Sequence, residues 1–196
     1  MSILFVAAVE FELDVARRVW GEAVLARRNS RHSGLDPESP FLCAGVGPDA
    51  TLRSLEARWR EEPAFDRVVD IGIAGSYRAS LPLGSVVHVT AEQRGDAPGP
   101  LLRQPAPWPE LAFLPACTGN TLQRLDDRFR QVAADVESME GAAVFAFCLR
   151  RGIPFAEIRA VSNFVGETDH ARWDIPLALR NLESALETFK NACTCF

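Results

Sequence analysis

Lysine is nearly absent from this sequence: all but one of its 21 basic residues are arginines, and Lys190 is the exception. Asp and Glu number 26, which leaves a formal net charge of −5. No segment is dense in basic residues. Surfaces that bind nucleic acids need clustered positive charge, so we expect no nucleic-acid partner.

Long hydrophobic runs are also missing. No apolar stretch approaches the roughly 18 residues that a membrane-spanning helix needs, so we expect no membrane partner. The first residues reach the acidic Glu10 without a basic leader, which argues against a signal peptide. We therefore expect a cytoplasmic protein.

The sequence has no clear metal-binding cluster. Cys43, Cys117 and Cys148 stand in apolar surroundings, and we expect them to be buried thiols. Cys193 and Cys195 have no second cysteine pair or histidine close by in the sequence, so a zinc site is not expected there. We predict neither a metal nor a cofactor.

A length of 196 residues with 47% hydrophobic and 24% charged residues predicts one globular domain spanning 1–196. No internal repeat is present. Residues 29–40 are polar and rich in turn-forming residues, without any periodicity, and we interpret them as an irregular insert. Residues 94–109 are rich in proline and predict either a loop over the site or a partly disordered excursion.

Apolar runs alternate with segments of helical periodicity along the chain. We predict strands at about 3–9, 41–46, 67–73, 85–90, 111–117 and 155–162, and helices at about 11–20, 50–62, 140–151 and 176–191. Asp49 is the expected N-cap of the second helix, and Gly72 is expected to break the third strand. The alternation predicts an α/β fold, a three-layer αβα sandwich around a mixed, mostly parallel central sheet.

Two polar side chains follow apolar runs at points where strands are expected to end. Glu140 lies in the run Val136-Glu137-Ser138-Met139-Glu140-Gly141-Ala142-Ala143, and Asn163 ends the run Ile158-Arg159-Ala160-Val161-Ser162-Asn163. In a parallel α/β sheet, ligands bind at the carboxyl ends of the strands. A carboxylate there can accept hydrogen bonds from sugar hydroxyls, and an amide can recognise a heterocycle. The pair suggests a nucleoside-like ligand.

Six motifs in order give the chain its resemblance to a known family. They are Ala8-Val9-Glu10-Phe11-Glu12, Gly45-Val46-Gly47, Gly72-Ile73-Ala74-Gly75-Ser76, Leu83-Gly84-Ser85-Val86-Val87, Met139-Glu140 and Ser162-Asn163. The chain resembles the nucleoside phosphorylase/nucleosidase superfamily, and within it the futalosine hydrolase branch. The resemblance covers about residues 1–20, 41–92 and 117–190 and fails over 21–40.

The resemblance implies an enzyme that hydrolyses the N-glycosidic bond of futalosine and releases hypoxanthine. It implies a small nucleoside as the partner, no cofactor, and a homodimer or higher homo-oligomer. Phosphorylases of the superfamily hold phosphate with arginines, and the matching early loop here contains Glu10 and Glu12 instead. Water is therefore the expected nucleophile.

The resemblance assigns three catalytic residues. Glu12 matches the carboxylate that activates water, Glu140 matches the carboxylate that binds the ribose 2′- and 3′-hydroxyls, and Asn163 matches the reader of the base. The simpler alternatives are helix-start acids for both glutamates, a role for which Glu137 is a better candidate than Glu140, and a turn residue for Asn163.

Five further residues are expected to contact the substrate: Ala8, Gly75, Ser76, Met139 and Ser162. Met139 is expected to pack its thioether against the sugar, with filling of the core as the alternative. Glycine at position 75 allows the backbone to approach a ligand closely. Ser162 is expected to support the base or to orient the neighbouring amide.

Asn163 separates the candidate substrates. Nucleosidases that act on methylthioadenosine and S-adenosylhomocysteine resemble this chain but have an aspartate at the matching position, which protonates the adenine. An amide cannot donate a proton in that way, but it can accept from N7–H and donate to a 6-oxo group. The alternatives are an adenine nucleosidase acting on those substrates or aminofutalosine, a purine nucleoside phosphorylase, and a non-catalytic nucleoside-binding protein.

Overall fold

The computed structural model describes residues 2–28, 40–61, 65–95, 100–123 and 133–193. Its strands are β1 (Ile3–Ala7), β2 (Phe41–Cys43), β3 (Arg67–Ser76), β4 (Val86–Arg94), β5 (Leu102–Arg103), β6 (Ala116–Thr121), β7 (Val136–Ser138) and β8 (Phe155–Phe164). Its α-helices are α1 (Glu10–Arg28), α2 (Pro48–Glu61), α3 (Gly141–Arg151) and α4 (Ile175–Cys193). Apart from residue 40, the expected insert lies outside the described residues.

The strands form one eight-stranded mixed sheet. Strand β3 runs parallel to β1 and β8, and β6 runs parallel to β4 and β7. The antiparallel pairs are β3 with β7, β4 with β8, and β4 with β5. The pairings β3–β8–β4–β6–β7–β3 close on themselves, so these strands curl into a small barrel. The predicted mixed, mostly parallel sheet is confirmed.

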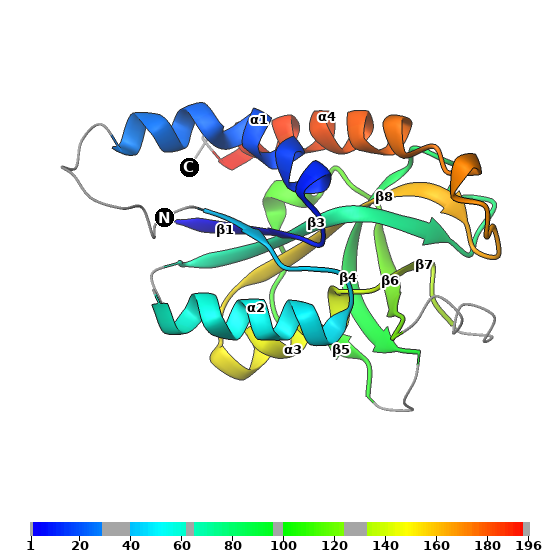
Figure 1. The fold of residues 1–196 in the computed structure, drawn as a ribbon, viewed down its shortest axis with the longest axis horizontal. Helices are drawn as coiled ribbons and strands as arrows, with labels where there is room; N and C mark the ends of the chain where they lie inside the picture. Colours follow the sequence, from blue (N-terminus) through cyan, green and yellow to red (C-terminus); the bar gives the residue numbers. More distant parts are fainter. Residues whose placement is uncertain (1, 29–39, 62–64, 96–99, 124–132, 194–196) are drawn as a thin grey trace.

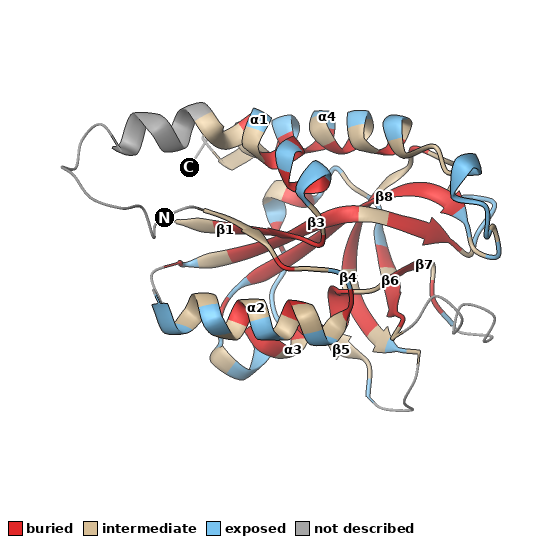
Figure 2. Ribbon diagram, in the orientation of Figure 1, coloured by how far each residue is buried: buried red, intermediate tan, exposed pale blue. Residues whose placement is uncertain are grey.

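Helices cover both faces of the sheet, as Figure 1 shows, with α1 and α4 on one side and α2 and α3 on the other. Along β8 the side chains alternate between the two cores: Phe155 packs with the α2/α3 core, and Ala156 packs with the α1/α4 core. Figure 2 shows that β3 and β8 are buried over most of their length. Burial along nearly the whole strand is typical of strands covered on both faces.

The structure corrects three local predictions. Strand β3 continues through Gly72 to Ser76, because β8 pairs with it over its whole length. The strand expected at 111–117 lies later, at 116–121, and a 3₁₀ turn occupies 109–111. Helix α2 begins at Pro48, so Asp49 lies in its first turn and is not the N-cap. Proline is well suited to the first helical position, since it lacks an N–H that would otherwise need a partner.

Other local predictions hold or need small changes. Helix α3 ends at Gly152, whose φ of 63° is the left-handed conformation expected of a glycine C-cap. Cys117 and Cys148 are buried free thiols, but Cys43 is only half-buried, because it lies on the short edge strand β2. Within the described part of the chain, no helix has the length and apolarity needed to cross a membrane.

Candidate active site

Glu12 lies in the first turn of α1, which follows the carboxyl end of β1, and Glu12 is only 4% exposed. Its Oε1 accepts a hydrogen bond of 2.9 Å from the backbone N–H of Ile73, and its Oε2 accepts one of 3.3 Å from Val9. Burial raises the pKa of Glu12, although the N–H of Ile73 and the charge of Arg159 oppose the rise. A carboxylate with a raised pKa is a stronger base than an exposed one.

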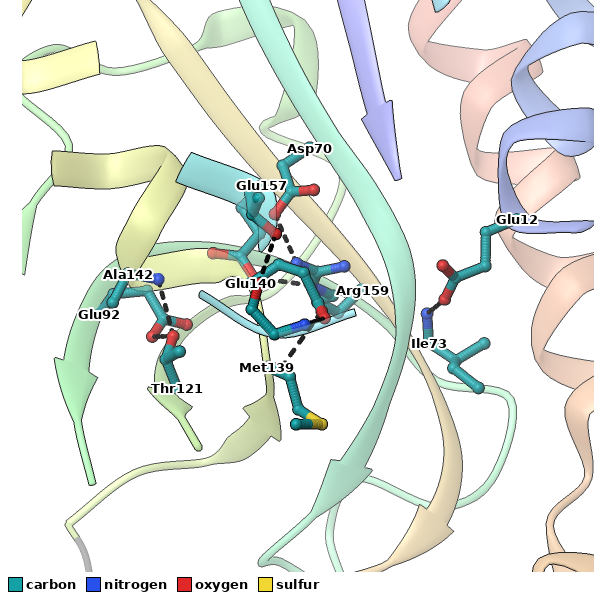
Figure 3. Close-up of polar contacts among 12 residues, drawn as sticks. Glu12, Asp70, Ile73, Glu92, Thr121, Met139, Glu140, Ala142, Glu157 and Arg159 are labelled. Atoms are coloured by element: carbon teal, nitrogen blue, oxygen red, sulfur yellow. Dashed lines mark hydrogen bonds and ion pairs between the residues drawn. The ribbon is translucent and has the colours of Figure 1, made fainter. Parts of the chain in front are cut away.

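Arg159 supplies the positive charge that opposes the burial-driven rise in the pKa of Glu12. A Cβ on Gly72 would clash with Arg159 Nη1 and would lie 2.8 Å from Glu12 Oε1, so both groups crowd the same backbone position. Two buried carboxylates form ion pairs with the guanidinium. Its Nη2 donates to Asp70 at 2.5 Å, and its Nε donates to Glu157 at 2.7 Å (Figure 3). Burial and the two ion pairs fix the position of the charge.

Glu92 completes this cluster of buried polar residues. Its Oε2 accepts from the hydroxyl of Thr121 at 2.7 Å, and that hydroxyl in turn accepts from the N–H of Ala142 (Figure 3). Burial, followed by the charge of Glu157, raises the pKa of Glu92 well above its usual range. A protonated Glu92 can donate a hydrogen bond to Glu157. This bond would give a partner to Glu92 Oε1 and Glu157 Oε2, which have no other hydrogen-bond partner among the described residues.

Glu140 precedes the first residue of α3 and is 6% exposed. Its Oε1 accepts from the N–H of Gly47 at 3.0 Å, and its Oε2 accepts from the N–H of Met139 at 3.2 Å. Gly45 and Gly47 have φ values of 84° and 92°, and this left-handed turn aims the Gly47 N–H at the carboxylate. The glycine turn noted in the sequence therefore positions Glu140.

Asn163 lies near the end of β8, where the register with β3 shifts. Ala74 pairs with Val161 and Gly75 pairs with Asn163, so Ser162 is an extra residue in β8. Bulges of this kind occur next to active sites, where they redirect a side chain. The hydroxyl of Ser162 donates to Asn163 Oδ1 at 2.8 Å, and Asn163 Nδ2 donates to the Phe164 carbonyl at 3.1 Å. Ser162 thus orients the amide.

The remaining predicted contact residues lie around these groups in different ways. The carbonyl of Ala8 accepts from the N–H of Gly45, which links β1 to the glycine turn. Gly75 lies beside Asn163 in the sheet. The side chain of Met139 is half-buried and points away from the polar cluster (Figure 3). The hydroxyl of Ser76 donates a hydrogen bond to the carbonyl of Arg78 and accepts one from the N–H of the same residue.

Sequence reasoning missed Arg159 and its carboxylate partners. A signal was present, because Glu157 and Arg159 interrupt the otherwise apolar run of β8 at alternate positions. Charges that are fully buried need partners, so this pattern predicts a polar cluster within the fold. The interpretation of Glu137 as a first-turn helix acid is wrong, since Glu137 lies in β7 and α3 begins at Gly141.

Comparisons with known proteins identify the family of the chain. The family model described as "Phosphorylase superfamily" matches residues 111–194. A futalosine hydrolase of Streptomyces coelicolor is 30% identical over 221 aligned positions, which cover 95% of this chain and 94% of that protein.

Solved structures share the fold. A futalosine hydrolase of Helicobacter pylori matches with a TM-score of 0.75 at 13% identity, covering 97% of both chains. A methylthioadenosine/S-adenosylhomocysteine nucleosidase of Helicobacter pylori, with butyl-thio-DADMe-Immucillin-A, matches with a TM-score of 0.79 at 13% identity, covering 100% of this chain and 99% of that one. At these identities the two structures show the fold alone.

The mixed sheet and its helices give the chain the α/β fold of these nucleosidase structures, and residues 111–194 match the phosphorylase superfamily. The similarity to the Streptomyces protein extends over nearly the whole length of both chains, and it identifies one family within this superfamily. The chain belongs to the futalosine hydrolase family.

Proposed function

We propose that this protein hydrolyses the N-glycosidic bond of futalosine and releases hypoxanthine. The observation that carries the proposal is that the Glu12 carboxylate and the Arg159 guanidinium both lie close to Gly72, in a chain that belongs to the futalosine hydrolase family. The products are the free base and a sugar with a hydroxyl at C1′. The function needs neither a metal nor an organic cofactor.

Glu12 is the proposed general base. Water attacks C1′ as the bond to the base breaks, and Glu12 takes the proton that the water loses. The bonding electron pair leaves with the base, and the purine anion takes up a proton from solvent to become hypoxanthine. The raised pKa of Glu12 suits it to this step. Arg159 keeps a fixed positive charge beside the carboxylate, because Asp70 and Glu157 hold its guanidinium. The burial of this pair makes electrostatic interactions stronger than they are in water.

Glu140 is the proposed ligand of the ribose hydroxyls. Each of its carboxylate oxygens already accepts one backbone N–H, and each has a second lone pair. The two hydroxyls of a ribose can use these remaining acceptor sites. Since the N–H of Gly47 binds one carboxylate oxygen and the N–H of Met139 binds the other, the orientation of the carboxylate is set before the substrate binds.

Asn163 is the proposed base reader, with Ser162 as the residue that positions it. Ala8, Gly75, Ser76 and Met139 are proposed to line the substrate site. The amide of Asn163 has no acid proton to transfer, so its chemistry suits a 6-oxopurine better than adenine.

The test is an assay of the purified protein with futalosine, aminofutalosine, methylthioadenosine and inosine, each with and without phosphate, and with identification of the released base. We expect hypoxanthine from futalosine at a rate that does not depend on phosphate. Ribose 1-phosphate as a product would contradict hydrolysis. A preference for methylthioadenosine would indicate an adenine nucleosidase, and no turnover of any substrate would indicate a binding protein.

A further inference from the structure

Four neighbouring strands place a row of residues side by side near the predicted base reader. Asn120 of β6 pairs with Glu137 of β7, Glu137 pairs with Gly75 of β3, and Gly75 pairs with Asn163 of β8. Residues paired across strands project to the same face of a sheet. The row therefore contains three polar side chains, with one gap where glycine has none.

The gap at Gly75 is flanked by polar atoms from both sides. A Cβ at this position would lie 3.2 Å from Asn163 Nδ2 and 3.3 Å from Glu137 Oε1. Both flanking residues are buried, with exposed fractions of 5% and 8%. The glycine thus leaves a narrow space between an amide nitrogen and a carboxylate oxygen.

The hydrogen bonds of Asn163 determine which end of its amide faces this space. The Phe164 carbonyl can only accept, so the atom that bonds to it is the amide nitrogen. The amide oxygen accepts from the hydroxyl of Ser162 on the other side. Asn163 therefore presents a donor next to Gly75.

Two successive hydrogen bonds orient the carboxylate of Glu137. The hydroxyl of Tyr77 donates to Glu137 Oε2 at 2.6 Å, and Asn120 Nδ2 donates to the Tyr77 oxygen at 3.0 Å. Burial, together with the hydrogen bond to Glu137, raises the pKa of Tyr77, so this hydroxyl keeps its proton. The contact fixes one carboxylate oxygen on Tyr77 and turns the other towards Gly75.

We propose that Glu137 is a second base-reading residue, which accepts the N1–H of a 6-oxopurine while Asn163 donates to the adjacent O6. This inference rests on the proposed function, because it concerns the base that the enzyme releases. Hypoxanthine has an acceptor at O6 and a donor at N1, whereas adenine has a donor and an acceptor at the same two positions. A donor and an acceptor in fixed positions therefore favour hypoxanthine.

Binding of free bases tests the role of Glu137 without any need for turnover. Calorimetry with hypoxanthine, 1-methylhypoxanthine and adenine compares the wild type with Glu137→Gln. We expect Glu137→Gln to lose about 10- to 100-fold in affinity for hypoxanthine, as for a buried hydrogen bond to a charged group, and to lose none for adenine. Wild-type protein should bind 1-methylhypoxanthine at least about 10-fold more weakly than hypoxanthine, because the methyl group replaces the N1–H.

The matched control is Glu110→Gln, which changes a glutamate that pairs with Arg67 at the other end of β3. It should bind hypoxanthine like the wild type. Hypoxanthine affinity of Glu137→Gln within twofold of the wild type would overturn the proposal. So would equal wild-type affinities for hypoxanthine and its 1-methyl derivative, and this second comparison remains decisive if the variant does not fold.

The outcomes separate this inference from the function on which it rests. Turnover of futalosine together with unchanged hypoxanthine binding in Glu137→Gln would leave the function standing and remove the role of Glu137. Selective, Glu137-dependent binding of hypoxanthine without hydrolysis of futalosine would support the role of Glu137 and contradict the proposed substrate.

Discussion

The side chains of Glu12 and Arg159 both lie within 3.0 Å of the place that a Cβ on Gly72 would take, at 2.8 Å for Glu12 Oε1 and closer still for Arg159 Nη1. Glu12 comes from α1, Arg159 comes from β8, and β3 runs between these two elements. Only a residue without a side chain leaves room for both groups at this point of β3. Gly72, which the sequence predicts as a break in this strand, lies instead within β3 and leaves room for the Glu12 carboxylate and the Arg159 guanidinium.

Gly72→Ala tests this relationship directly. The new methyl group would displace Arg159 or Glu12, so we expect kcat/KM to fall by at least about 10-fold and the free energy of unfolding to fall by about 1–3 kcal/mol. Steady-state kinetics and denaturant unfolding measure the two effects. The control is Gly21→Ala in α1, where a Cβ would meet nothing within 4 Å. This control should be as active as the wild type and about 0.5–1 kcal/mol more stable. Full activity in Gly72→Ala would show that the spacing of the two groups does not matter.

Catalysis is expected to need both Glu12 and Glu140. Glu12→Gln removes the proposed general base, and Glu140→Gln weakens the proposed hydrogen bonds to the ribose hydroxyls. Each substitution should therefore lower kcat/KM by about 100-fold or more. The amide is nearly isosteric with the carboxylate, and circular dichroism should show unchanged folding. Turnover close to that of the wild type in either variant would refute the role given to that residue.

The pH profile gives a second measure of Glu12. Because its pKa is raised by burial, kcat/KM should fall with decreasing pH at a point above the ordinary glutamate value of 4.5. Glu12→Gln should lose this acidic limb of the profile together with most of the activity. An acidic limb that persists unchanged in the variant would assign the titration to another group.

Arg159 is expected to stabilise the fold as well as the site. Arg159→Met leaves the carboxylates of Asp70 and Glu157 buried without their cation, which should cost about 3–5 kcal/mol of stability. A triple variant that adds Asp70→Asn and Glu157→Gln removes those charges and should recover most of the stability, without recovering activity. Urea unfolding and futalosine assays separate these effects. A triple variant with full activity would show that the guanidinium has no part in the reaction.

The sequence was informative where local rules decide the structure. The alternation of apolar and helical segments predicted the layers, and Gly152 predicted the end of α3, because both depend on short-range patterns. The order of motifs identified Glu12, Glu140 and Asn163 as candidates through resemblance. What could not be predicted depends on pairing between distant strands.

The closure of the barrel is the main example of such pairing. Only the register of β6, β7, β3 and β8 places Glu137 beside Gly75 and Asn163. In the sequence, Glu137 resembled an acid at the start of a helix. The bulge at Ser162 is equally invisible in the sequence, since an extra residue appears only when β8 is aligned against β3.

The buried carboxyl of Glu92 should make stability depend on pH. Its pKa is raised by burial, so the folded protein binds a proton that the unfolded chain releases. Stability should therefore fall as the pH rises from 4.5, the ordinary glutamate pKa, towards the raised pKa, with a slope of up to about 1.4 kcal/mol per pH unit. Glu92→Gln keeps a neutral acceptor for Thr121 and should flatten this dependence. Thermal unfolding across pH measures the change, with Glu187→Gln at an exposed position of α4 as the control. An unaltered slope in Glu92→Gln would show that Glu92 is ionised in the folded protein.

Asn163 should set the choice between futalosine and aminofutalosine. Its amide presents a donor towards Gly75, where a 6-oxo group can accept, whereas an aspartate presents an acceptor or an acid proton. Asn163→Asp exchanges a matched polar pair for a mismatched one, at a cost of about 1–3 kcal/mol, so the preference should shift by about 10- to 100-fold towards aminofutalosine. The quantity to measure is the ratio of kcat/KM for the two substrates, because the loss of the hydrogen bond from Nδ2 to the Phe164 carbonyl lowers total activity for both. Ser162→Ala is the control: it loosens the amide without changing its chemistry, and should reduce both rates with little change in the ratio. If Asn163→Asp leaves the ratio unchanged, Asn163 does not read the base, and Glu137 becomes the residue to which base selectivity would have to be assigned.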